Sequence, residues 1–219
     1  MIKFLVNVLV FVLDNLYKDR SYPRFYVLET VARVPYFAYT SVLHFYETVG
    51  LWRKCNWLKV HFAESWNEMH HLLIMESLGG DKYLIDRFLA HFCATLYFWI
   101  LVVVYAVAPM AAYQFMEEVE SHAYHTYDKF VRQHGEELKT QPAPEVALKY
   151  YGEGDIYMFD AFQTAQAVEL RRPTINNLYD VFVAIRDDEL EHVKTMTACQ
   201  EPGTDLDFKA NQNPKKELV

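Results

Sequence analysis

The sequence is poor in glycine, proline, cysteine and net positive charge, and each shortage argues against a class of protein. Only seven glycines and eight prolines occur among 219 residues, which argues against a turn-rich all-β fold. The three cysteines, Cys55, Cys93 and Cys199, form no Cys-x-x-Cys pair, so neither a disulfide framework nor a thiolate zinc site is indicated. This cysteine usage favours a reducing compartment. The net charge of −8 and the lack of a basic stripe argue against a nucleic-acid partner.

Apolar and aromatic residues are abundant instead, and they recur with the period of a helix. Hydrophobic residues make up 52% of the chain and aromatic residues 16%. This pattern predicts an all-α fold. We expect helices over about residues 3–17, 22–50, 54–78 and 174–199, a helical region over about 86–133 with a kink or break at Pro109, and short helices and loops over about 134–172. Residues 1–200 are expected to form one domain, followed by a polar tail at 201–219.

One segment, residues 92–115, carries no charge and is long enough to cross a bilayer. It either spans the membrane or lies partly in one leaflet as an interfacial helix. The N-terminal residues 1–20 resemble a signal peptide but lack a small-residue cleavage site, so we interpret them as a retained amphipathic helix. We therefore expect two membrane-facing segments, about residues 1–20 and 86–115.

Two Glu-x-x-His motifs suggest a metal centre. Glu68 and His71 in "WNEMHHLLIME", and Glu189 and His192 in "RDDELEH", each lie three residues apart, which places both side chains on one face of a helix. His70 points away by about 100° and cannot share the first site. Two such motifs can arise by chance, and a pair on an ordinary polar face is the alternative.

A carboxylate-bridged di-iron site in a four-helix bundle needs two Glu-x-x-His motifs and one further Glu from each of two other helices. Glu29 in "FYVLETVARVP" is one candidate, with a surface pair to Arg33 as its alternative. Glu120 is the other, and on this reasoning its neighbours Glu117 and Glu118 remain open. Oxygen-rich ligands with two imidazoles suit iron or manganese better than zinc.

Two polar residues precede the motif glutamates. Asn67 and Asp188 stand directly before Glu68 and Glu189, where they can hydrogen-bond the imidazoles from outside the metal shell. The alternative is polarity on a helix surface.

At these residues the sequence resembles the alternative oxidase superfamily, most closely its plastid terminal oxidase branch. The resemblance extends over about residues 13–200 and is carried by "VLETVARVPYF", "HFAESWNEMHHLLIMESLGG", "VESHAYHTYDKF" and "NLYDVFVAIRDDELEHVKTM". It implies a ferritin-like four-helix bundle with a di-iron centre. The iron ligands that it implies are Glu29, Glu68, His71, Glu120, Glu189 and His192. Glu120 is selected over its neighbours because Tyr127, seven residues later, matches a family tyrosine.

The resemblance also implies an activity. Family members are non-haem di-iron quinol oxidases that reduce dioxygen to water without pumping protons and that attach to one leaflet as homodimers. The region before the last helix, residues 150–180, resembles the plastid type, which favours plastoquinol as substrate and a thylakoid or other photosynthetic membrane as location. Tyr127 is implied to supply an electron and a proton. The implied quinol pocket is formed by Arg24, Leu28, Ala123 and Thr126, beside His122, where the mitochondrial pattern has a Glu.

Three other functions fit parts of the pattern. A di-iron hydroxylase of a quinone precursor would use the same ligand formula. A non-enzymatic integral membrane scaffold would use residues 92–115 as a span. A ferritin-like iron store would not need so much lipid-compatible surface.

Overall fold

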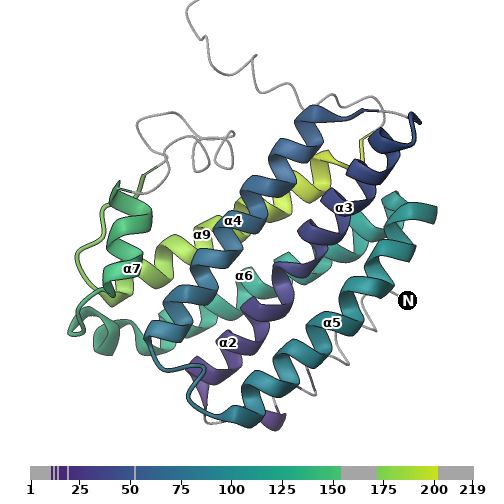
Figure 1. The fold of residues 1–219 in the computed structure, drawn as a ribbon. Helices are drawn as coiled ribbons and strands as arrows, with labels where there is room; N and C mark the ends of the chain where they lie inside the picture. The colour runs from purple at the N-terminus through teal and green to yellow at the C-terminus, as the bar shows by residue number, and fades with distance from the viewer. Residues whose placement is uncertain are drawn as a thin grey trace, which may run out of the picture.

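The structure, a computed structural model, describes residues 11, 13, 15–18, 20–51, 53–153 and 172–201. Within these ranges every regular element is helical, which confirms the predicted all-α, ferritin-like bundle (Figure 1). The elements are α2 (Ser21–Ala32), α3 (Val34–Thr48), α4 (Cys55–Ser77), α5 (Leu84–Val107), α6 (Pro109–Lys139), α7 (Glu145–Leu148), the π-helical turn η1 (Lys149–Glu153) and α9 (Leu178–Ala198). Most of the segment expected to form an N-terminal helix, and the tail at 202–219, lie outside the described residues.

Two prolines set the helix boundaries that the periodicity alone did not. The single helix expected over residues 22–50 is wrong, because the chain breaks at Arg33 between α2 and α3. Pro35 has no N–H to donate to the preceding turn, and its ring crowds that turn, so it begins a new helix. The break at Pro109 occurs as expected, with Ala108 separating α5 from α6.

The bundle is built from the α2–α3 segment, α4, α6 and α9. The α2–α3 segment packs on α4, α6 pairs along its length with α9, and α5 lies outside against α2 and α3 (Figure 1). Gly79 follows the end of α4 at Ser77 and has a positive φ of 80°, which is common for a glycine just after a helix. Gly80 then passes so close to α2 that an added Cβ would lie 2.7 Å from the Tyr22 carbonyl oxygen. This contact fixes the end of α4 against α2.

The buried core forms two clusters, both with buried tyrosines, that differ in how their aromatic rings are grouped. One surrounds Tyr127, whose ring neighbours are phenylalanines; we call Phe25, Phe130 and Phe182 the phenylalanine cluster. The other contains four closely spaced tyrosines, which we call the tyrosine cluster: Tyr36, Tyr39, Tyr105 and Tyr113.

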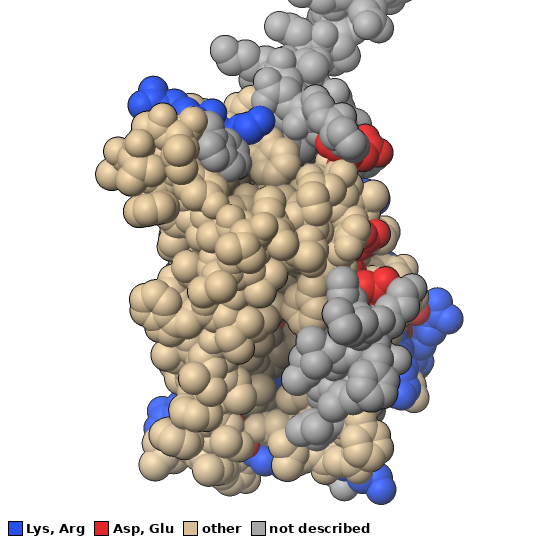
Figure 2. All heavy atoms as spheres, turned by 90° about the vertical axis from the view of Figure 1, so that its right-hand side faces the viewer, with Lys and Arg blue, Asp and Glu red and all other residues tan. Residues whose placement is uncertain are grey.

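α5 buries one side and exposes a broad apolar face. Ala90, Leu101 and Tyr105 pack inward. The exposed side carries Leu84, Phe88, Phe92, Trp99, Val103 and Val107, and Figure 2 shows an apolar surface almost free of charged side chains on this side. Among the described residues α5 is the helix long and apolar enough to cross a membrane. Because its inner side packs on α2 and α3, α5 is an integral part of the bundle rather than an isolated helix.

Candidate metal centre

Six fully buried side chains from four helices meet in the middle of the bundle. α2 contributes one glutamate, α6 contributes another, and α4 and α9 each contribute a Glu and a His three residues apart. Each of the six has 0% exposed surface: Glu29, Glu68, His71, Glu120, Glu189 and His192. The structure therefore brings together all six residues that the sequence singled out.

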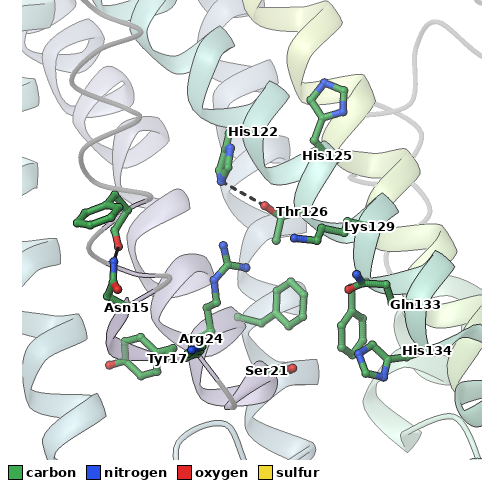
Figure 3. Close-up of a pocket in the computed structure, with 14 residues that line it drawn as sticks. Asn15, Tyr17, Ser21, Arg24, His122, His125, Thr126, Lys129, Gln133 and His134 are labelled. Atoms are coloured by element: carbon green, nitrogen blue, oxygen red, sulfur yellow. Dashed lines mark hydrogen bonds between the residues drawn. The ribbon is translucent and has the colours of Figure 1, made fainter.

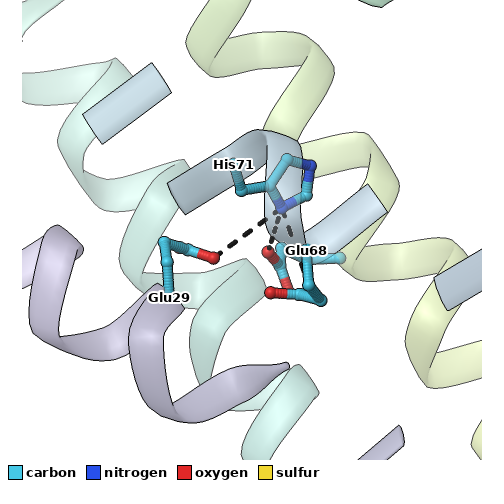
Figure 4. A group of neighbouring side chains, drawn as sticks. Glu29, Glu68 and His71 are labelled. Carbon is cyan, nitrogen blue, oxygen red and sulfur yellow. Dashed lines mark ion pairs between the residues drawn. The ribbon is translucent and has the colours of Figure 1, made fainter. Parts of the chain in front are cut away.

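The ligand atoms of these residues fall into two overlapping groups. Glu29, Glu68, His71 and Glu189 offer atoms within 4.8 Å of one another, and so do Glu68, Glu120 and His192. Glu68 belongs to both groups, so its carboxylate lies where it could bridge two ions. His71 Nδ1 faces the carboxylates directly, at 3.8 Å from Glu29 Oε2 and 3.8 Å from Glu68 Oε1 (Figure 4). The same nitrogen lies 3.3 Å from Glu189 Oε1.

The contacts in the structure argue against two of the three alternatives considered for the single glutamates, namely Glu117 and the Glu29–Arg33 pair. Glu117 accepts hydrogen bonds from Gln200 Nε2 at 2.7 Å and from Thr197 Oγ1 at 3.1 Å, at the end of α9. Glu29 contacts Tyr127 and His71, rather than forming a surface pair with Arg33. Glu120 and Glu29 are thus the residues that α6 and α2 direct into the cluster.

Several ligand-type atoms in the cluster are buried without a hydrogen bond. They are Glu29 Oε2, Glu68 Oε2, Glu120 Oε2, both carboxylate oxygens of Glu189, and His71 Nδ1. An unsatisfied buried carboxylate costs several kcal/mol or more unless a cation compensates it. Lone pairs of this kind, converging from several helices, are the donor set that one or two hard cations require. The residues present therefore fit a metal pair.

The carboxyl groups affect one another strongly. Burial raises the pKa of Glu29, Glu120 and Glu189 well above the usual range, and the charge of neighbouring carboxylates raises it further. Burial acts in the same direction on Glu68, but the contact with His192, at 3.0 Å from Nε2 to Oε1, and the nearby imidazoles leave its pKa lowered. Among the four carboxyl groups of the cluster, Glu68 is thus the one whose pKa is lowered.

The side chains of the two residues that precede the motif glutamates each contact the motif histidine of the other helix. Asn67 on α4 lies 2.9 Å from His192 Nε2 through its Oδ1 atom, and Asp188 Oδ2 on α9 lies 3.1 Å from His71 Nε2. Asn67 Nδ2 also donates to Asp188 Oδ2 at 2.9 Å. Because the Asp188 carboxylate accepts the hydrogen bond from His71 Nε2–H, the other ring nitrogen, Nδ1, is held facing the cluster carboxylates.

Two tyrosines close the centre from opposite ends. The Tyr127 hydroxyl on α6 donates to Glu29 Oε1 on α2, and the Tyr36 hydroxyl on α3 donates to Glu120 Oε1 on α6 at 2.6 Å. Each tyrosine follows a cluster glutamate by seven residues: Tyr36 follows Glu29, and Tyr127 follows Glu120. The centre therefore has approximate two-fold symmetry, with α2–α3 equivalent to α6 and α4 equivalent to α9.

Sequence reasoning missed Tyr36, Tyr150 and Tyr151. The signal for Tyr36 was its spacing of seven residues from Glu29, the same spacing that singled out Tyr127. Tyr151 donates to Asp188 Oδ2 at 2.8 Å, and the Tyr150 hydroxyl lies 2.8 Å from Asn67 Nδ2. Both lie in η1, a five-residue turn within a stretch where glycine and proline obscured any pattern.

A cavity of about 700 Å³ lies beside the centre, between the start of α2 and the middle of α6 (Figure 3). Arg24 and Thr126 line it, and Thr126 Oγ1 lies 3.2 Å from His122 Nε2, another lining residue. The other two residues of the implied quinol pocket, Leu28 and Ala123, are not among its lining residues; each lies one helical turn from Arg24 or Thr126 toward the metal centre.

One wall of this cavity is in contact with Tyr127. Phe25 lines the cavity, and its ring stacks on Tyr127 with centroids 4.5 Å apart and an interplanar angle of 13°. A molecule in the cavity is therefore separated from Tyr127 by a single ring.

Comparison with known proteins gives a consistent result. A model of the family described as "Alternative oxidase" matches residues 1–201. "Ubiquinol oxidase 4, chloroplastic/chromoplastic" from Arabidopsis thaliana is 62% identical over 201 residues, covering 92% of this chain and 57% of that protein.

Mitochondrial relatives are more distant. "Ubiquinol oxidase 2, mitochondrial" from Glycine max is 27% identical over 180 residues, covering 82% of this chain and 48% of the relative. "Ubiquinol oxidase, mitochondrial" from Mangifera indica is also 27% identical over 180 residues, covering 82% and 50%. The chain thus spans between about half and three fifths of the length of these relatives.

Proposed function

The chain belongs to the alternative oxidase family, and from that premise we propose that it is a membrane-bound, non-haem di-iron quinol oxidase that reduces dioxygen to water. The observation that carries the proposal is the convergence of four carboxylates and two imidazoles, four of these six groups in two Glu-x-x-His pairs, inside the helical bundle. Two quinols would supply the four electrons and four protons for each dioxygen, without proton pumping.

The proposed iron ligands are the six buried residues of the cluster. Glu68 would be available to both ions, because its carboxylate belongs to both ligand groups. The iron pair, when bound, supplies open positions for dioxygen and the electrons that begin its reduction. Asn67 and Asp188 orient the two imidazoles.

The quinol is proposed to bind in the cavity between α2 and α6. Arg24 would donate to a quinol oxygen, with Thr126 on the facing wall and Leu28 and Ala123 below the head group. The stacked pair of Phe25 and Tyr127 would separate the ring from the metal centre. Binding in this position holds the donor close to its acceptor, which is the contribution of positioning to catalysis.

Tyr127 is proposed to take part in the chemistry. Its hydroxyl contacts the Glu29 carboxylate, so a proton has an acceptor in place when the phenol gives up an electron. Burial raises the pKa of Tyr127 well above its usual range, and the charge of Glu29 raises it further, so the phenol holds its proton until that step.

Plastoquinol is the proposed quinol, and a thylakoid or other photosynthetic membrane the proposed location. The support is the 62% identity to a chloroplastic relative, compared with 27% to mitochondrial ones. We propose that the apolar face of α5 lies in one leaflet and that the protein acts as a homodimer. The inner side of α5 packs on α2 and α3, which favours an interfacial position over a free span.

The test is oxygen consumption by the purified, iron-loaded protein with short-chain plastoquinol and ubiquinol analogues, together with iron and product analysis. We expect about two irons per chain, water and quinone as products, and faster turnover with plastoquinol. Oxygen inserted into the quinone ring would instead indicate a hydroxylase. Absence of bound iron, with membrane attachment retained, would indicate a scaffold.

A further inference from the structure

The tyrosine cluster contains a hydrogen-bonded group that the proposed reaction does not use. The Tyr113 hydroxyl on α6 lies 2.9 Å from His61 Nε2 on α4, and His61 Nδ1 lies 2.9 Å from Glu64 Oε2. The Tyr105 hydroxyl lies 2.6 Å from the Tyr113 hydroxyl. All four side chains are buried, with exposures from 0% to 2%.

This arrangement gives Tyr113 a base for its phenolic proton. When His61 Nδ1–H donates to the Glu64 carboxylate, the Nε2 lone pair accepts the hydrogen bond of the Tyr113 hydroxyl. A phenol is oxidised by one electron far more easily when its proton can move to a base at the same time. Tyr39, in the same cluster, has no such base, because its hydroxyl donates to the Ala112 carbonyl oxygen at 3.2 Å.

Stacked rings connect Tyr113 to the metal centre. The Tyr113 ring lies 5.6 Å from the His61 ring at 28°, and the His61 ring lies 6.2 Å from Tyr36 at 30°. Tyr36 in turn donates to Glu120, one of the cluster carboxylates. Two ring-to-ring steps therefore separate Tyr113 from a residue in contact with the metal ligands.

On its other side, the Tyr113 ring contacts a residue that lies closer to the protein surface. Its ring lies 5.5 Å from that of Trp57, which is half-buried near the start of α4. Within the described part of the chain, the Tyr127 ring contacts Phe25 and Phe182, which are much harder to oxidise. The tyrosine cluster thus offers an oxidisable path from the centre to the surface that the phenylalanine cluster does not.

We propose that Tyr113, with His61 as its proton acceptor, is a second redox-active tyrosine that removes oxidising equivalents from the metal centre when quinol is lacking. This inference rests on the proposed function, because the oxidant is the metal pair after its reaction with dioxygen. One electron passes from Tyr113 to that pair, and the phenolic proton passes to His61 Nε2. The products are a neutral tyrosyl radical and an imidazolium held by the Glu64 carboxylate.

The resting state is restored from the surface. Trp57 gives one electron to the Tyr113 radical while the proton returns from His61, and a thiol or another one-electron reductant in solution refills Trp57. Electrons and protons balance in each step, and the metal ligands are spared from oxidation.

The experiment uses the iron-loaded full chain with ¹⁵N-labelled histidine, reduced and then mixed with dioxygen in the absence of quinol. Freeze-quenched samples are examined by electron paramagnetic resonance and electron–nuclear double resonance. We expect a tyrosyl radical whose hydrogen bond shows coupling to an imidazole nitrogen. Tyr113→Phe should remove this signal, and His61→Gln should remove the nitrogen coupling.

Tyr26→Phe is the matched control, because Tyr26 is equally buried but lies in the other core cluster. The tyrosyl radical and its nitrogen coupling should both survive in Tyr26→Phe and in Tyr127→Phe. Nitrogen coupling in the unsubstituted protein excludes Tyr127, which hydrogen-bonds a carboxylate, but not Tyr36, whose hydroxyl lies 3.1 Å from His192 Nδ1. If Tyr113→Phe fails to fold, the coupling should therefore survive in Tyr36→Phe and be lost in His61→Gln, and the reverse result overturns the inference.

Two results overturn the inference while the proposed function stands: a preparation that holds iron and oxidises quinol but forms no tyrosyl radical, or a radical that persists unchanged in Tyr113→Phe. A preparation without iron or quinol-dependent oxygen uptake overturns both.

Discussion

Tyr127 and Tyr36 occupy equivalent positions on the two sides of the metal centre but have different neighbours. Each donates to a buried glutamate across the bundle, and each follows a cluster glutamate by seven residues. The Tyr127 ring contacts Phe182 and the cavity-lining Phe25. The Tyr36 ring instead contacts Tyr39, His61 and His192. The hydrogen bonds to glutamate are thus symmetric, although the Tyr36 hydroxyl also lies 3.1 Å from His192 Nδ1. The surrounding rings, which decide where an electron can go, differ.

This difference suggests a division of labour. Phenylalanines around Tyr127 would keep an oxidising equivalent beside the cavity, where quinol can reduce it. When quinol does not reduce it, the oxidising equivalent would instead pass through the tyrosine cluster toward the surface.

The largest effect is expected from removing the metal centre, because the functions proposed for Tyr127 and for Tyr36 and its cluster both depend on it. Glu68→Ala removes the carboxylate that belongs to both ligand groups, so iron binding and quinol-dependent oxygen uptake should fall to background. Iron analysis and an oxygen electrode measure the two outcomes. Glu76→Gln, on the same helix but outside the cluster, is the control and should retain both. Substantial activity in Glu68→Ala would contradict the ligand assignment.

Substituting the tyrosine on each side of the metal centre separately tests whether the two sides differ in function. Tyr127→Phe should lower kcat on the order of 100-fold with iron content unchanged, because the proton donor and its acceptor are no longer paired. Tyr36→Phe should lower kcat much less at saturating quinol, since the ring next to the cavity is intact. Equal losses in the two variants, measured as oxygen uptake per bound iron, would show that the two sides are functionally alike.

The crossed contacts on α4 and α9 allow a milder test of the centre. Asp188→Asn replaces the carboxylate that orients His71, so iron affinity should fall by roughly 10- to 100-fold. Competition with a chelator measures the affinity. Asp187→Asn changes a neighbouring residue that pairs with Arg186 at 2.7 Å, and should have no effect. An unchanged affinity in Asp188→Asn would mean that His71 is oriented by other contacts.

The smallest effect is expected at the cavity, beside the phenylalanine cluster. Arg24→Gln removes the proposed charged donor to the quinol, which should raise KM for plastoquinol by about 10-fold and change kcat little. Lys129→Gln removes another positive charge from the cavity wall and separates a general charge effect from a specific contact. Similar KM values in the two variants would point to a general charge effect.

Sequence spacing predicted the parts of the centre that repeat along one helix. Glu68 with His71, and Glu189 with His192, could be paired because residues three apart share a helix face. Glu29 and Glu120 could not be paired by spacing, because each is a single ligand from its own helix, and Glu120 was distinguished from Glu117 and Glu118 only by family resemblance.

Other features depend on contacts between segments distant in the chain. The donation from Tyr36 to Glu120 joins residues 84 positions apart, and no local pattern specifies it. The break at Arg33 shows the reverse, a local signal from Pro35 that the apolar periodicity obscured. Tyr151 reaches Asp188 from a short π-helical turn whose composition suggests only a loop.

The paired spacing of seven residues also has a mechanical consequence. Glu29 with Tyr127, and Tyr36 with Glu120, form two rungs between the α2–α3 segment and α6, about 10 Å apart along the helix axes. Sliding one helix along the other by a single turn would break both rungs together and leave two carboxylates without their phenols. The two tyrosines therefore lock the sliding register of the bundle at the level where the metal pair has to fit.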